Sequence, residues 1–274
     1  MKKIGVLGPK GTYSELTAYA QFKSGFELVR YHTITDVVKA VGRGSVDGGI
    51  MPIESLREGS VGEALDALTW GNIKIKGEIV SQVSHALLAI KGTKIENVTH
   101  VLSHPQALAQ CRGFLRKKIP DAELIDMAST AKAAEQVSKT KKLHMAAIGP
   151  NNLVELYGLE ILHDNIQSGE KNITRFLHIA KNDNRRTGTD KTSIVFYTKV
   201  DRPGILHEIL GVFASRKINL TKIESRPSKR ALGEYFFFID FVGHRRDKEI
   251  SDVLKEIKKK TAMLKIIGSY PKKF

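Results

Sequence analysis

Residues 181–190 divide the sequence into two parts with different patterns of apolar residues. They read Lys-Asn-Asp-Asn-Arg-Arg-Thr-Gly-Thr-Asp and contain no aliphatic or aromatic side chain. Ten successive residues of this kind have nothing to bury, which is typical of a linker rather than of a helix or strand in a core. We therefore expect two domains, over residues 1–180 and 192–274, joined by a linker over residues 181–191.

Short apolar runs alternate with amphipathic segments through the first domain. Strands are expected over residues 4–7, 26–31, 46–53, 73–76, 79–90, 98–102, 123–127, 144–148 and 159–162, and helices near residues 13, 35, 61, 104, 131 and 150. This βα alternation predicts an α/β fold with largely parallel sheets. It further suggests two lobes, with the chain crossing between them twice and a small ligand bound in a cleft between them.

The pattern restarts after the linker. Strands are expected over residues 193–200, 218–225, 234–242 and 263–269, and helices over residues 203–216 and 247–260. The order βαββαβ within about 80 residues is that of a ferredoxin-like module.

Composition excludes several classes of protein. Apolar residues make up 41% and charged residues 27% of the 274 residues, which is typical of a globular chain. No apolar run approaches the roughly 20 residues that span a bilayer. Cys111 is the single cysteine, so the chain has neither a disulfide framework nor a cysteine-rich zinc module. We expect a cytoplasmic protein that has no membrane partner.

Positive charge is concentrated in the C-terminal third. Residues 1–180 hold 22 basic and 18 acidic residues, so residues 181–274 hold the other 44 − 22 = 22 basic and 29 − 18 = 11 acidic residues. A net charge of 22 − 11 = +11 is compatible with a polyanion partner or with a solvated Lys/Arg face. Because basic and aromatic residues do not interleave as in RNA-binding motifs, we expect no nucleic-acid partner.

The turn Gly8-Pro9-Lys10-Gly11-Thr12-Tyr13-Ser14 lies between an expected strand and an expected helix. Backbone N–H groups and the helix dipole suit such a turn to a carboxylate or a phosphate. A capped tight turn is the alternative, since Thr12 and Glu15 have the spacing of a capping box.

Two other segments also allow more than one interpretation. Ser103 either binds a ligand or caps the helix that begins near His104. His100 and His104 lie on different elements, so we expect no metal site there. Cys111 lies on the apolar face of its expected helix, so we expect it in the protein core. In Asn172-Ile173-Thr174-Arg175-Phe176, the residues alone suggest a strand start with a polar Thr174 and a solvated Arg175.

These segments, taken in order, resemble one enzyme family. The matching motifs are 8–14, Pro52-Ile53-Glu54 with Gly59-Ser60-Val61, 103–111, Ala146-Ala147-Ile148, Tyr157-Gly158-Leu159 with Asn165-Ile166-Gln167, 172–176, Arg202-Pro203-Gly204 and 224–227. The chain resembles prephenate dehydratase with a C-terminal ACT regulatory domain, and the resemblance covers nearly the whole sequence.

The resemblance implies a catalytic domain folded like a type II periplasmic binding protein. It implies the decarboxylating dehydration of prephenate to phenylpyruvate in phenylalanine biosynthesis, with no cofactor and no metal. Thr174 would donate a hydrogen bond to the leaving hydroxyl, and Arg175 would bind a substrate carboxylate. The other residues that the resemblance assigns to the substrate are Phe176, Gly11, Thr12, Glu54, Ser55, Ser103 and Gln110.

The sequence departs from the family at Ser55-Leu56, where Asn-Ser is usual. Serine lacks the NH₂ donor of asparagine, so one substrate contact is expected to be missing or replaced by water. Loss of a hydrogen bond to a charged group costs about 1.5–3 kcal/mol.

The ACT module implies feedback inhibition by phenylalanine, bound between the modules of paired subunits in a dimer or tetramer. The residues that would line this effector site are Gly204, Ile205, Leu206, His207, Glu224, Ser225, Arg226 and Pro227.

Three alternatives remain open at this point. Arogenate dehydratase performs the same elimination on an amino acid. A non-catalytic amino-acid sensor would keep the two domains without turnover, although Thr174-Arg175-Phe176 argues against that. A nucleic-acid-linked regulator is suggested only by the basic C-terminal third.

Overall fold

The computed structural model describes residues 1–169, 172–231 and 233–273, so Leu232 and Phe274 of the predicted C-terminal domain lie outside it. The chain forms two compact units. Unit 1 consists of Met1–Val37, Ile50–Val61 and Val80–Phe176, and unit 2 of Val38–Gly49, Gly62–Ile79 and Leu177–Phe274. Two N-terminal segments therefore belong to the same unit as the C-terminal module, and the units do not divide at the predicted linker.

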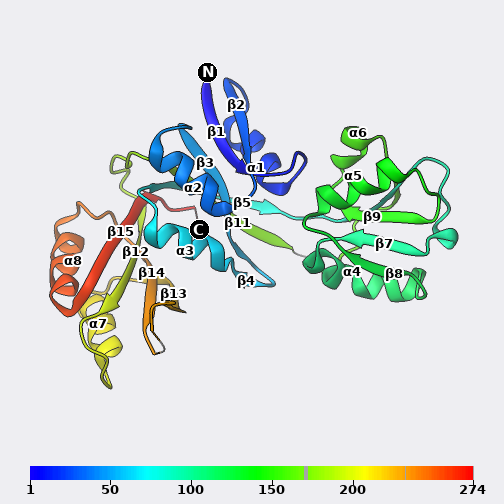
Figure 1. The fold of residues 1–274 in the computed structure, drawn as a ribbon. Coiled ribbons are helices and arrows are strands. Elements are labelled where there is room, and N and C mark those ends of the chain that lie inside the picture. Colours follow the sequence, from blue (N-terminus) through cyan, green and yellow to red (C-terminus); the bar gives the residue numbers. More distant parts are fainter. Residues whose placement is uncertain (170–171, 232, 274) are drawn as a thin grey trace. The chain divides into compact units, whose positions relative to one another are not determined.

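The first sheet has the strand order β2-β1-β3-β11-β5, with β4 paired to β3 (Figure 1). Its strands are β1 (Lys2–Leu7), β2 (Phe26–Tyr31), β3 (Gly48–Ser55), β4 (Gly59–Ser60), β5 (Lys74–Gln82) and β11 (Ile173–Ala180), and the helices between them are α1 (Tyr13–Phe22), α2 (Ile34–Arg43) and α3 (Gly62–Trp70). β1 and β2 are parallel, as the alternating pattern predicts.

The second sheet lies within unit 1 and has the order β10-β6-β9-β7-β8. Its strands are β6 (Ala86–Ala89), β7 (His100–Ser103), β8 (Glu123–Asp126), β9 (Met145–Gly149) and β10 (Glu160–His163), accompanied by a 3-10 turn (Ile95–Asn97) and by helices α4 (Pro105–Lys118), α5 (Thr130–Thr140) and α6 (Leu153–Tyr157). β6 is antiparallel to both neighbours, which corrects the expectation of largely parallel sheets. The chain enters this sheet at β6 directly from β5 of the first sheet.

Both faces of the second sheet are covered by helices (Figure 1). Leu87, Ala146 and Ile148 pack with α4 in one core, whereas Leu88 and Ala147 pack with α5 in another. Alternate residues of one strand thus enter opposite cores, which explains why these strands read as continuous apolar runs. The chain passes from the first sheet to the second after β5 and returns after β10, so the predicted double crossing is confirmed.

The C-terminal module has the predicted βαββαβ order. It comprises β12 (Asp190–Thr198), α7 (Ile205–Ala214), β13 (Leu220–Pro227), β14 (Tyr235–Val242), α8 (Lys248–Lys260) and β15 (Thr261–Pro271). The sheet order β13-β14-β12-β15 is that of a ferredoxin-like fold. Both helices contribute to one core with residues of β12 and β14, so they cover the same face of this sheet (Figure 1).

Two helix starts differ from the sequence-based predictions, and a third agrees but lacks the expected capping hydrogen bond. His104, not Ser103, occupies the N-cap of α4, and its Nδ1 accepts from the Gln106 N–H at 3.3 Å. Thr12 does occupy the N-cap of α1, but its hydroxyl donates to the Leu7 carbonyl instead of capping the helix. Pro150 precedes a turn, and α6 begins three residues later at Leu153.

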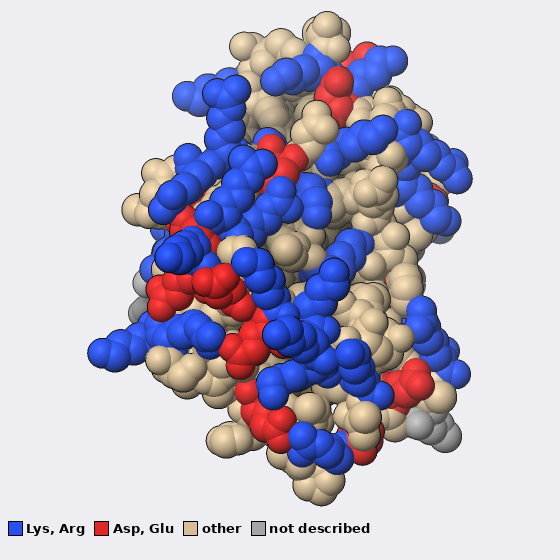
Figure 2. Space-filling view, turned by 90° about the vertical axis from the view of Figure 1, so that its left-hand side faces the viewer, with Lys and Arg blue, Asp and Glu red and all other residues tan. Residues whose placement is uncertain are grey.

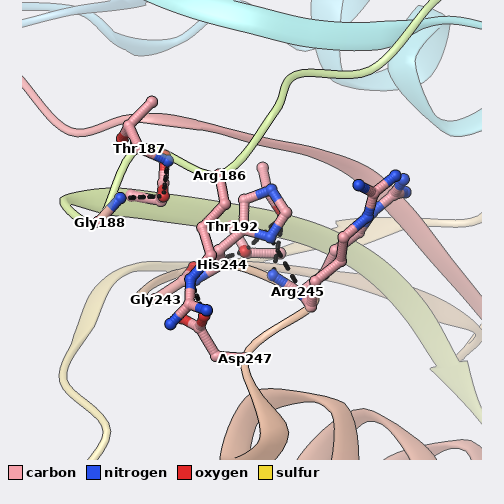
Figure 3. Close-up of polar contacts among 11 residues, drawn as sticks. Arg186, Thr187, Gly188, Thr192, Gly243, His244, Arg245 and Asp247 are labelled. Carbon is pink, nitrogen blue, oxygen red and sulfur yellow. Dashed lines mark hydrogen bonds and ion pairs between the residues drawn. The ribbon is translucent and has the colours of Figure 1, made fainter.

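The end of the linker is held by polar contacts (Figure 3). The Asp190 carboxylate accepts from the N–H groups of Thr187 and Gly188 at 2.9 and 3.1 Å. The Thr192 hydroxyl donates to the Gly243 carbonyl at 2.6 Å. β12 therefore begins at Asp190, before the predicted end of the linker at residue 191.

Candidate active site

The ends of three strands meet in unit 1. The Leu56 N–H donates to the Ile173 carbonyl at 2.8 Å, and the Val83 N–H donates to the Asn172 carbonyl at 2.7 Å. The first residues of β11 therefore lie between the residues that follow β3 and β5. This junction brings Thr174 and Arg175 beside Glu54 and Ser55, which are more than a hundred positions earlier in the sequence.

Arg175 is buried and held by an acidic partner. The residue is 9% exposed, and its Nη2 lies 2.9 Å from Glu54 Oε2. The expectation of a solvated Arg175 is therefore wrong, because β11 is an inner strand of its sheet. An arginine side chain carries five N–H donors, so a guanidinium fixed by Glu54 retains the donor geometry that binds a carboxylate.

Thr174 and Phe176 flank Arg175 with different surroundings. Thr174 is partly buried, and its hydroxyl has no hydrogen-bond partner among the residues that the structure describes. Phe176 is 2% exposed and belongs to the core, so its predicted contact with a ligand stays a prediction.

Gln110 is fixed by two side chains that the sequence did not single out as site residues. Its Oε1 lies 2.7 Å from Asn172 Nδ2 and 3.1 Å from His85 Nε2. Burial lowers the pKa of His85 to about 4, partly opposed by its hydrogen bond to Gln110. Asn172 lies in the motif of residues 172–176, whereas His85 follows a strand and has no spacing or motif that would mark it.

The Gly8–Ser14 turn satisfies part of its own hydrogen bonding. The Gly11 N–H donates to Glu15 Oε2 at 3.0 Å, and Glu15 also pairs with Arg30 Nη2 at 2.8 Å. The sequence suggested that the N–H groups of this turn could bind an anion, but the Gly11 N–H is already bound to the Glu15 carboxylate. Gly11 has φ +90°, and a Cβ there would lie 2.5 Å from Leu153 Cδ2, so this turn packs closely against α6.

Ser55 and Ser103 are both buried. The Ser55 hydroxyl accepts from the Arg57 N–H at 3.4 Å. Ser103 is fully buried, and its hydroxyl donates to the Ile148 carbonyl at 2.7 Å, linking β7 to the end of β9. Their predicted contacts with substrate stay predictions, and Ser103 has a clear structural role in the second sheet.

Cys111 lies in the core, as predicted. It is fully buried against β6, β7 and β9, and burial raises the pKa of its thiol to about 12. A thiol of that pKa is protonated at neutral pH and is a poor nucleophile.

The predicted effector segments lie on two elements of unit 2. Gly204 forms the N-cap of α7 with φ 84°, followed by the partly buried Ile205 and Leu206 and by the exposed His207. Residues 224–227 end β13, which is an edge strand of its sheet. Arg226 is tied to Asp66 of α3 by a bidentate ion pair, a contact that the sequence did not predict.

Lys and Arg side chains gather on the side of the molecule shown in Figure 2, interspersed with acidic side chains. On α8, Lys248, Lys255, Lys258 and Lys259 are exposed, whereas Ile250, Val253, Leu254 and Ile257 enter the core. The basic residues of this helix thus form its solvated face.

Among residues 1–169, 172–231 and 233–273, no three His, Cys, Asp or Glu side chains are grouped so as to hold a metal ion. Within the same residues, every helix is too short or too polar to cross a bilayer.

Comparison with known sequences identifies both parts of the chain. A family profile described as prephenate dehydratase matches residues 4–184, and a profile described as ACT domain matches residues 192–259. The prephenate dehydratase of Methanocaldococcus jannaschii is 40% identical, and the alignment covers 96% of each chain. A bifunctional chorismate mutase/prephenate dehydratase of Aquifex aeolicus is 43% identical over 98% of this chain and 74% of the relative.

A solved structure agrees with these matches. The prephenate dehydratase of Arthrobacter aurescens, in complex with L-Phe, superposes with a TM-score of 0.91 at 32% sequence identity. The superposition covers 98% of this chain and 90% of that one.

Proposed function

The chain belongs to the prephenate dehydratase family and catalyses the decarboxylating dehydration of prephenate, and on that premise we propose how its residues do so. The substrate binds where β3, β5 and β11 meet in unit 1. The observation that carries this proposal is the buried guanidinium of Arg175, which Glu54 holds at 2.9 Å next to the partly buried Thr174.

In the reaction, the bond between the ring and its carboxylate breaks and CO₂ departs. The electron pair of that bond completes the aromatic ring, and the C4 hydroxyl leaves as hydroxide, which takes up a proton from solvent to become water. Thr174 donates a hydrogen bond to the departing oxygen, and preorganised dipoles stabilise the charge that develops on it. A positioned proton donor of this kind contributes about 10²–10⁴-fold.

Arg175 binds one substrate carboxylate through parallel N–H donors. Its orientation is set by Glu54 from the end of β3. Gln110 donates its amide N–H groups to the substrate from α4. Prephenate is a dianion, and the net charge of 22 − 18 = +4 on residues 1–180 favours its approach.

The ACT module binds phenylalanine as a feedback inhibitor between the modules of paired subunits, in a dimer or tetramer located in the cytoplasm. Residues 204–207 and 224–227 line this effector site. Two observations support this: the Arthrobacter aurescens relative was solved with L-Phe, and β13 is an edge strand of its sheet, which a second module can approach.

The test is phenylpyruvate formation by the purified protein from prephenate, with and without phenylalanine, next to the same assay of phenylalanine formation from arogenate. We expect turnover of prephenate that phenylalanine suppresses. Turnover of arogenate alone would identify the chain as an arogenate dehydratase. A folded protein that turns over neither substrate would instead support the non-catalytic amino-acid sensor. Sedimentation with and without phenylalanine tests the assembly.

A further inference from the structure

His85 is a buried residue for which the mechanism above has no use. It lies between β5 and β6, is 4% exposed, and is held at several points. Its backbone N–H donates to Gln167 Oε1 at 2.8 Å, and its carbonyl accepts from the Ile166 N–H at 2.9 Å. The Tyr13 ring packs edge-on against the imidazole with the ring centroids 5.9 Å apart.

The hydrogen bonds of His85 fix which ring nitrogen carries the proton. Burial lowers its pKa to about 4, so the imidazole is neutral at physiological pH and has one N–H group. Its Nε2 lies 3.1 Å from the amide oxygen of Gln110, which can only accept. The proton therefore sits on Nε2. The hydroxyl of Tyr13, 3.4 Å from Nδ1, donates its proton to the Ser84 carbonyl.

Two donors thus converge on one oxygen of Gln110, since Asn172 Nδ2 lies 2.7 Å from the same atom. An amide group is planar, so holding its oxygen also sets the direction of its NH₂ group. The NH₂ group lies on the other side of the amide carbon from the oxygen, so its two N–H donors point away from His85 and Asn172.

We propose that His85 is a positioning residue that holds the Gln110 amide in the orientation in which its N–H donors face a substrate carboxylate. The inference rests on the proposed placement of Gln110 in the substrate site. Without the His85 donor, the Gln110 amide can rotate by half a turn and present its oxygen to the substrate carboxylate. The hydrogen bonds from the amide N–H groups are then replaced by repulsion between two oxygens.

The experiment compares two amide side chains at position 85. In His85→Gln, the side-chain nitrogen lies as many bonds from Cα as Nε2 of histidine and can reach Gln110. In His85→Asn, the nitrogen takes the position of Nδ1 and cannot reach it. Both replacements bury a neutral amide, so a purely structural effect should be similar for the two, and thermal unfolding of each variant measures that effect.

We expect His85→Asn to raise the KM for prephenate by about tenfold, the effect of losing one hydrogen bond to a charged group, and His85→Gln to recover most of it. In a Gln110→Leu background, His85→Asn should have no further effect on KM, because the residue that it orients is gone. Equal KM values for the two variants at position 85, or additive effects in the double variant, would overturn the inference.

Gln110→Leu alone separates this inference from the proposed site. An unchanged KM in that variant would remove Gln110 from the substrate site, and the positioning role of His85 with it. A raised KM in Gln110→Leu together with normal KM values in both His85 variants would leave the site intact and refute the role of His85 alone.

Discussion

Arg226 and Asp66 form a bidentate ion pair within unit 2. Arg226 Nε lies 2.5 Å from Asp66 Oδ1, and Arg226 Nη2 lies 3.0 Å from Asp66 Oδ2. These hydrogen bonds hold the pKa of Asp66 below its usual value and raise that of Arg226. Asp66 lies on α3, which follows β4, the strand that pairs with Glu54 and Ser55. The pair therefore joins the predicted effector segment of β13 to helix α3.

Asp66→Asn is expected to weaken inhibition by phenylalanine. The substitution removes the charge that holds Arg226, so a change at β13 is transmitted less well to α3. Coupling between two sites usually amounts to about 5–150-fold in affinity, and we expect the half-inhibitory phenylalanine concentration to rise by at least about fivefold. Uninhibited kcat/KM should stay within about twofold. Asp252→Asn, an exposed carboxylate on α8, is the matched control and should change neither value.

Lys191→Met is expected to destabilise the protein strongly. Lys191 Nζ lies 2.9 Å from Glu78 Oε2, and both side chains are almost fully buried at 2% and 0% exposure. Removing one partner of a buried pair leaves an uncompensated charge, which costs about 3–5 kcal/mol. Urea denaturation measures this loss, and Glu78→Gln added to Lys191→Met should recover part of it.

The control for that measurement is Lys139→Met. Lys139 forms an exposed ion pair with Glu135 on α5, and such pairs contribute less than about 1 kcal/mol. Similar losses of unfolding free energy in Lys191→Met and Lys139→Met would show that burial of the Lys191–Glu78 pair does not determine its contribution to stability.

Lys265 should make stability depend on alkaline pH. Its Nζ donates to the carbonyls of Leu68, Thr69 and Gly71 at the end of α3. Burial, and then the charge of Lys74, lower the pKa of Lys265 from 10.5 to about 8. Between these values the unfolded chain binds the proton more tightly than the folded protein, so stability rises with pH.

Urea denaturation of wild type and Lys265→Met between pH 7 and 10 tests this dependence. The unfolding free energy of wild type, relative to that of Lys265→Met, should increase as the pH rises from 7 to 10. A shift in the opposite direction would mean that the three carbonyls stabilise the ammonium more than burial disfavours it.

The sequence predicts the elements well where apolar periodicity is strong. The continuous runs of β6 and β9 and the stripe of α8 are examples, since each is set by burial on a defined face. The sequence predicts the partners of individual hydrogen bonds less well. Thr12 and Glu15 have capping-box spacing, but the carboxylate of Glu15 binds the Gly11 N–H and Arg30, which comes from another element.

The long-range contacts of the site could not be predicted from one sequence. Arg175 looks like a solvated residue until β11 is known to be an inner strand and Glu54 is known to lie beside it. His85 and Gln110 are 25 positions apart on different elements, so their hydrogen bond depends on how the second sheet packs against α4. The resemblance of ordered motifs supplied Thr174, Arg175 and Glu54, whereas the ion pair between Arg175 and Glu54 came from the structure.

The most direct test of the proposed mechanism is turnover of prephenate by Thr174→Ala and Thr174→Ser. We expect Thr174→Ala to lower kcat by at least about a hundredfold while the protein stays folded, because it removes the donor to the leaving hydroxyl. Thr174→Ser keeps a hydroxyl at the same position and should recover most of that loss. A near-normal kcat in Thr174→Ala, or equal losses in the two variants, would contradict the role of Thr174 as the donor.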